Sequence, residues 1–141
     1  MGKGFGQLAG IYQSGIEVGR QKNAQTSGRS HALLVTEDVF LQCCMLGLTD
    51  IVKYMLHRKL GDPTIRDNMA IRMACRDGDT SIVEILLDDP NVDADADDGF
   101  CIIISSIHGR SDIVKMLLAN GRVNPAVDDN YALEKACENG H

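Results

Sequence analysis

The segments IVKYML at residues 51–56, IVEILL at 82–87 and IVKMLL at 113–118 decide the fold, because they repeat one apolar pattern every 31 residues. A second block repeats in the same register: DNMAIRMACRDG from Asp67, DGFCIIISSIHG from Asp98 and DNYALEKACENG from Asp129. A fixed period of this length is typical of stacked repeats. We therefore predict repeats at 36–66, 67–97 and 98–128, with a partial repeat at 129–141.

Each repeat is predicted to hold two short helices joined by a tight turn. The second helix would begin at Thr49, Thr80 or Ser111, whose hydroxyl can accept a hydrogen bond from a free amide as an N-cap. A glycine two residues earlier lets the chain turn sharply. Helices this short are marginal alone, so copies must pack on one another. The sequence thus predicts an all-α helix-turn-helix solenoid of about 3.5 repeats.

The repeat units resemble the ankyrin repeat family over residues 36–141. The resemblance rests on the order Asp, Ala-Ile or Ala-Leu, Ala74 or Ala136, Gly, Ile-Val and Leu-Leu. The family's Thr-Pro-Leu-His opening is replaced, for example by Met69-Ala70-Ile71-Arg72, and its Gly-Ala-Asp loop is shortened or missing. The resemblance implies L-shaped units stacked into a curved slab that binds proteins, with the first helices lining the concave surface.

Composition narrows the class of protein. The 141 residues are 44% apolar and contain no tryptophan, which suits one domain with an aliphatic core. Four basic residues against one acidic residue give 1–35 a charge of +3, so the net charge of −6 leaves −9 for residues 36–141. An acidic body disfavours nucleic acid and anionic membranes as partners, and no apolar run is long enough to span a bilayer.

The five cysteines indicate a reducing compartment, because their number is odd and no disulfide framework is evident. We therefore expect an intracellular, cytoplasmic protein. Residues 1–35 do not fit the register and are predicted to be a Gly-rich basic leader, either weakly helical or flexible. Its basic, acid-poor composition also leaves organelle targeting open.

Columns of equivalent residues separate the scaffold from the surface. Columns that stay apolar or small are predicted to form the core: Phe40, Ile71, Ile102 and Leu133; Cys43, Ala74, Ser105 and Ala136; Ile51, Ile82 and Ile113; Val52, Val83 and Val114; Leu56, Leu87 and Leu118. Three columns change character, at offsets of 0, 3 and 7 on one face of the first helix. We call these twelve positions the variable stripe: Asp38, Met69, Phe100 and Tyr131; Leu41, Arg72, Ile103 and Glu134; Met45, Arg76, Ile107 and Glu138.

The variable stripe is the predicted partner-binding surface. Along the array the stripe changes from basic residues through apolar to acidic ones. The residues predicted to contact the partner are Met69, Arg72, Arg76, Phe100, Ile103, Ile107, Tyr131, Glu134 and Glu138. An apolar centre flanked by charge is typical of a protein interface. The alternative is that these residues pack between repeats, with Arg72 pairing with Glu134 or a loop carboxylate. The loop tips Asn68, Gly99 and Asn130 are weaker candidates.

The sequence contains no complete calcium-binding, metal-binding or catalytic motif. Asp93, Asp95 and Asp97 suggest a calcium loop, but its twelfth position is Ile104 rather than Glu. Cys43 and Cys44 lack partners at metal-ligand spacing. Instead Cys44, Cys75 and Cys137 share one column with Ser106, a slot for a small side chain, and the four histidines share none. We therefore predict no enzyme activity, no cofactor and no metal.

The leading prediction is a non-catalytic scaffold that binds another protein. The sequence identifies neither that partner nor the oligomeric state of the scaffold. The alternative is a truncated or vestigial structural fragment, or part of a longer protein that carries an effector or enzyme domain. The sequence stops at Gly140-His141, where the second helix of the fourth repeat would begin. Continuation of the natural chain, truncation and coverage by a partner all remain open at this point.

Overall fold

The computed structural model describes residues 29–141, with side chains from residue 37 onward. This part of the chain forms helices and no strand: α2 (Arg29–Met45), α3 (Thr49–His57), α4 (Ile65–Asp77), α5 (Thr80–Leu87), α6 (Ala96–Ile107), α7 (Ser111–Asn120) and α8 (Val127–Glu138). The all-α prediction is confirmed. Most of the predicted leader, residues 1–28, lies outside the described residues.

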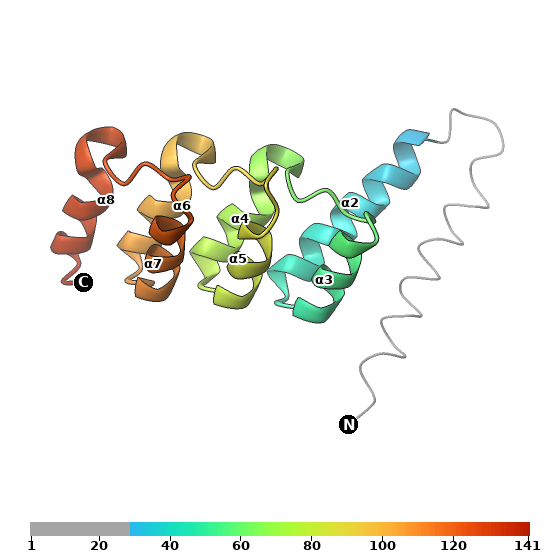
Figure 1. Ribbon diagram of the computed structural model, residues 1–141, viewed down its shortest axis with the longest axis horizontal. Helices are drawn as coiled ribbons and strands as arrows, with labels where there is room; N and C mark the ends of the chain where they lie inside the picture. Colours follow the sequence, from blue (N-terminus) through green and yellow to red (C-terminus); the bar gives the residue numbers. More distant parts are fainter. Residues whose placement is uncertain (1–28) are drawn as a thin grey trace, which may run out of the picture. The chain divides into compact units, whose positions relative to one another are not determined.

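Residues 40–141 form one compact unit of two helical rows. In one row α4 packs on α6 and α6 on α8, and in the other α3 packs on α5 and α5 on α7. The rows are joined within each repeat, where α4 packs on α5 and α6 on α7 (Figure 1). The three Ile-Val segments therefore lie on equivalent, neighbouring helices, as their spacing predicts.

The helix starts reproduce the 31-residue period in both rows. The second helices begin at Thr49, Thr80 and Ser111, and the first helices at Ile65, Ala96 and Val127. Gly47, Gly78 and Gly109, at the turns between helices, and Gly140, which follows α8, all have positive φ. A residue with a Cβ is strained there. The predicted tight turns are therefore confirmed.

The predicted hydroxyl caps are wrong. Thr49 and Ser111 are the first residues of their helices, and their hydroxyls donate to the carbonyl of the glycine two residues earlier at 3.2 and 3.5 Å. Among α3–α8, only α5 has a side-chain cap, in which Asp79 accepts from the amide of Ile82 at 3.1 Å. A hydroxyl one residue inside the helix faces back to the turn and cannot reach the second-turn amides.

The core of the first row follows the predicted columns. Phe40, Ile71 and Ile102 are between 0% and 2% exposed. Leu133 belongs to the same column but is 64% exposed, because no described helix follows α8 in the row. Burying an isoleucine of this kind contributes about 1.5–3 kcal/mol. The burial of this column, and the stability that it contributes, therefore depend on a neighbouring repeat.

The core of the second row differs by one column from the prediction. The innermost side chains are Met55, Leu86 and Leu117, each 0% exposed, whereas Leu118 of the predicted column is 47% exposed. The inner residue follows the opening isoleucine by four positions, on the same helical face. Ile82 and Ile113 are buried there, whereas Ile51 and Val114 of the predicted core columns are only partly buried. The next leucine is rotated by about 100° around the helix, which exposes Leu118 but leaves Leu87 buried at 9% exposure.

The first turn of α4, α6 and α8 contains three residues in the left-handed conformation. They are Arg66–Asn68, Asp97–Gly99 and Asp128–Asn130, with φ between +50° and +75°. Asp, Asn and Gly tolerate this conformation better than other residues. The turns recur every 31 residues because the sequence supplies these residue types at each one. Nothing in the helical periodicity had indicated them.

Candidate functional site

The variable stripe lies mostly on the solvent-facing surface of α4, α6 and α8. Met69, Arg72, Phe100, Ile103, Ile107 and Tyr131 are partly exposed, and Asp38, Met45, Arg76, Glu134 and Glu138 are exposed. Leu41 is buried instead, at 5% exposure. The residues behind the stripe on the same helices, such as Ile102 and Ser105, are buried. The periodicity therefore separated the inner and outer faces of these helices correctly, except at Leu41.

Arg72 takes part in contacts between neighbouring repeats. Its guanidinium pairs with Asp97 at 2.5 Å and Asp67 at 3.7 Å, and it lies 5.0 Å from the ring centroid of Phe100. Its side chain is 20% exposed. Arg72 therefore packs between repeats, as the alternative interpretation of the stripe expects, and it pairs with loop carboxylates rather than with Glu134. Arg72 holds the α4 and α6 units in register and presents little free charge.

The apolar centre of the stripe is on α6. Phe100, Ile103 and Ile107 are partly exposed, and Arg72 stacks on one face of the Phe100 ring. The guanidinium fixes this ring by a cation–π contact and still leaves its edge accessible. The result is a rigid apolar surface whose side chains need little further ordering when a partner binds.

The charged ends of the stripe are partly neutralised by neighbours. On α4, Arg76 forms an ion pair with Asp77 at 2.8 Å, and this hydrogen bond raises the pKa of Arg76. On α8, Lys135 contacts Glu138 at 2.6 Å and Glu134 at 4.0 Å, and lies over the ring of Tyr131 at 5.1 Å. The hydrogen bond with Glu138 raises the pKa of Lys135. The predicted basic-to-acidic gradient is therefore weaker than the sequence suggests.

A family model for ankyrin repeats matches residues 40–129 as three copies. The chain belongs to the ankyrin repeat family. Searches of curated proteins and of solved structures gave no significant match. Ankyrin repeats are in general protein–protein interaction modules and typically non-catalytic scaffolds.

Two of the predicted loop-tip contacts are structural in this ankyrin array. Asn68 is 8% exposed, and its side-chain oxygen accepts from the amide of Asp93, in the loop before α6, at 2.9 Å. Gly99 is buried, and a Cβ there would lie 2.6 Å from a methyl carbon of Val127. Both residues hold adjacent loops together, so the prediction of exposed loop tips is wrong for them. Asn130 is exposed as predicted.

The acidic loop before α6 also has structural roles. Asp93 accepts from the amide of Asp95 at 2.9 Å, which closes an Asx turn. Asp95 accepts from the amide of Asn124 in the next ankyrin repeat at 3.1 Å. Asp97 pairs with Arg72. These carboxylates order the loops, and no group of three metal-ligating side chains occurs among the described residues.

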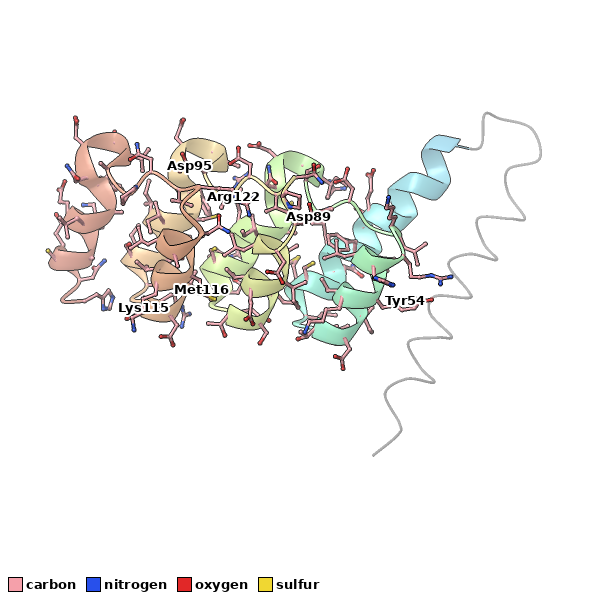
Figure 2. All side chains as sticks on the ribbon, in the orientation of Figure 1. Tyr54, Asp89, Asp95, Lys115, Met116 and Arg122 are labelled. Atoms are coloured by element: carbon pink, nitrogen blue, oxygen red, sulfur yellow. The ribbon has the colours of Figure 1, made fainter. Side chains whose placement is uncertain are left out.

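Arg122 is the main contact that the sequence did not reveal. It follows α7 and donates to the carbonyls of Leu87 at 2.7 Å and Val92 at 2.9 Å, and to those of Pro90 and Asp89 at 3.2 and 3.3 Å. Figure 2 shows it reaching toward the loop that carries Asp89. The equivalent positions in the other ankyrin repeats are Asn91 and Leu60. Because the arginine is not repeated, comparison of columns could not single it out.

A shallow hollow of about 420 Å³ lies between the C-terminal end of α2 and the α4–α5 turn. Its lining includes Met45 of the variable stripe, Leu46 and Asp77. Met45 and Leu46 are 53% and 70% exposed. The hollow is lined mainly by polar groups of the α4–α5 turn, among them Asp77, Asp79 and Thr80, and Met45 is its one contact with the variable stripe.

The described cysteines of the ankyrin units are free thiols, and all but Cys137 are buried. Burial, with smaller effects of Cys43 and Asp79, raises the pKa of Cys44 to about 12. A hydrogen bond with Cys75, together with burial, raises the pKa of Cys101. Protonated buried thiols are poor nucleophiles and metal ligands. In residues 29–141 no helix is both long and apolar enough to cross a membrane.

Proposed function

We propose that this ankyrin array is a non-catalytic scaffold that binds a partner protein through the variable stripe on α4, α6 and α8. The observation that supports the proposal most directly is the apolar centre of the stripe. Phe100, Ile103 and Ile107 stay partly exposed on a helix whose opposite face is buried. The scaffold columns are nearly constant between repeats, whereas these positions change from basic to apolar to acidic.

Rigidity supports the same role. The stripe is fixed by the Arg72–Asp97 ion pair and by the stack of Arg72 on Phe100. A surface ordered before binding loses less conformational entropy on association. We also propose a cytoplasmic location, because free buried thiols suit a reducing compartment.

A comparison of two variants by affinity capture tests the proposal. Ile103→Asp places a charge in the apolar centre, and Met116→Asp does the same at a partly exposed residue of α7, outside the stripe (Figure 2). Immobilised wild-type chain and both variants are incubated with one cell extract, and bound proteins are quantified by mass spectrometry. Thermal melts of the three proteins show that each is folded.

The expected result is a set of proteins retained by the wild type and by Met116→Asp but lost by Ile103→Asp. A charge buried against an apolar partner surface costs several kcal/mol, which removes a complex of ordinary affinity. Equal retention by Ile103→Asp and the wild type, with both proteins folded, would show that the stripe is not the binding surface.

A further inference from the structure

Three carboxylates form an acidic edge beside the apolar centre of the stripe: Asp98, Asp128 and Asp129. They lie in the left-handed turns that begin α6 and α8, and Figure 1 shows these turns next to each other at the same end of their helices. All three are exposed. None forms an ion pair or side-chain hydrogen bond with another described residue, unlike Asp67 and Asp97, which share Arg72.

The acidic edge needs no negative charge for its backbone conformation, although the first turn of a helix favours such charge through the helix dipole. The left-handed conformation is satisfied equally by an uncharged Asn, as Asn68 and Asn130 show in the same turns. Like charges held close together repel and reduce stability. Residues 40–141 carry 17 acidic and 10 basic side chains, a net charge of −7, so the surroundings do not compensate the edge. A partner with positive charge would compensate the negative charge of the acidic edge.

The acidic edge continues directly into the apolar centre. Asp98 lies in the left-handed turn of α6; along the regular helix that follows, which rises about 1.5 Å per residue, Ile103 and Ile107 lie roughly 5 and 11 Å beyond Phe100. Phe100 itself is two residues beyond Asp98. An extended segment covers these distances with about two to four residues. Charge and apolar surface can therefore be contacted by one short stretch of a partner chain.

We propose that the partner binds by a basic, amphipathic segment. An aromatic or branched apolar side chain of that segment packs on Phe100, Ile103 and Ile107. Lys or Arg side chains about two to four residues away contact the acidic edge. The inference rests on the proposed function and specifies the chemistry of the partner. Charge complementarity of this kind speeds association and rejects acidic competitors.

Selection of peptides on the full chain tests the inference. The probe is a phage-displayed library of random peptides, and the enriched peptides are then synthesised and their dissociation constants measured. The test variant is Asp98→Asn, Asp128→Asn, Asp129→Asn, which removes three charges and keeps side chains that accept positive φ. The control is Glu84→Gln, Asp88→Asn, Asp112→Asn, the same charge change at exposed positions on and after α5 and on α7.

We expect enriched peptides to combine Lys or Arg with an aromatic or branched apolar residue. The test variant should weaken their binding about tenfold, as the sum of three exposed charge pairs. The control should weaken it less than about twofold, because its charges lie outside the acidic edge and are exposed to screening by salt. Added salt should remove the difference between the two variants. Neutral or acidic enriched peptides, or equal weakening by both variants, would overturn the inference.

The Ile103→Asp variant separates this inference from the proposed function. If it abolishes binding while the acidic-edge variant does not weaken it, the stripe binds partners but the partner is not basic. If Ile103→Asp leaves the binding of every enriched peptide unchanged, or no peptide is enriched, both proposals fail.

Discussion

Removal of the Arg122 side chain should destabilise the array far more than its surface position suggests. Its guanidinium bridges two consecutive repeats, since it follows α7 and donates to four carbonyls at the end of α5 and in the loop beyond. The carbonyls of Leu87 and Val92 are in partly buried surroundings and receive the two shortest of these bonds, at 2.7 and 2.9 Å. The other two carbonyls are exposed and can turn to water.

The magnitude follows from the two partly buried bonds. Hydrogen bonds from a charged donor contribute about 1.5–3 kcal/mol each, and the lower end applies to partly exposed groups. We therefore expect Arg122→Ala to lower the free energy of unfolding by about 2–3 kcal/mol. Arg122→Lys should recover less than half of this, because an ammonium group cannot contact several carbonyls in one plane.

Urea unfolding followed by circular dichroism measures these differences. The midpoint should fall for Arg122→Ala while the slope of free energy against urea stays constant. Lys115→Ala is the control, since Lys115 lies on α7 with 76% of its side chain exposed and a 3.7 Å pair with Asp112 (Figure 2); it should cost less than about 0.5 kcal/mol. An Arg122→Ala protein as stable as the control would refute the reasoning.

The burial of individual side chains determines the effect of further substitutions and reagents. Ile102→Ala should lower the free energy of unfolding by about 2–4 kcal/mol, whereas Leu133→Ala, in the same column but 64% exposed, should cost less than about 1 kcal/mol by urea unfolding. Ser105→Ala should stabilise the fold by roughly 1 kcal/mol in the same assay, because its buried hydroxyl has no hydrogen-bond partner; a destabilised variant would contradict this. Cys44, with a pKa raised from 9.0 to about 12, stabilises the fold fully below pH 9, and this contribution should disappear between pH 9 and 12. Stability measured over that range should therefore fall more steeply for the wild type than for Cys44→Ala, while Cys137 alone among the described cysteines should react quickly with a thiol reagent.

The repeat could be predicted from the sequence because its two constant blocks encode the same packing three times. The starts of α3, α5 and α7 at Thr49, Thr80 and Ser111 follow directly from that register. The inner column was misplaced by one residue, at Leu118 instead of Leu117, because both positions are leucine and composition does not distinguish them. Only the angle between the helix and its neighbours decides which side chain points inward.

Contacts made once, between different repeats, could not be predicted in this way. Arg122 binds main-chain carbonyls, which leave no trace in the side-chain pattern of the loop that they belong to. Asp95 likewise binds an amide of the following repeat, and Asn68 binds an amide of the loop at the far end of its own repeat. Their aspartate and asparagine side chains looked like exposed loop residues, since their partners are more than 20 positions away in sequence. The exposed residues of the variable stripe could be predicted more completely than these contacts, because exposure along a helix follows a simple period.

Methyl NMR of isoleucine-labelled protein tests the central claim most directly, because the isoleucines sample both the stripe and the core. A peptide enriched on the full chain is titrated into the labelled protein, and the shifts of the isoleucine methyl groups are followed. The account predicts large shifts for Ile103 and Ile107, which are partly exposed on α6, and small ones for the buried Ile82 and Ile113 of α5 and α7. Shifts confined to α5 and α7, with Ile103 and Ile107 unchanged, would contradict binding through the variable stripe.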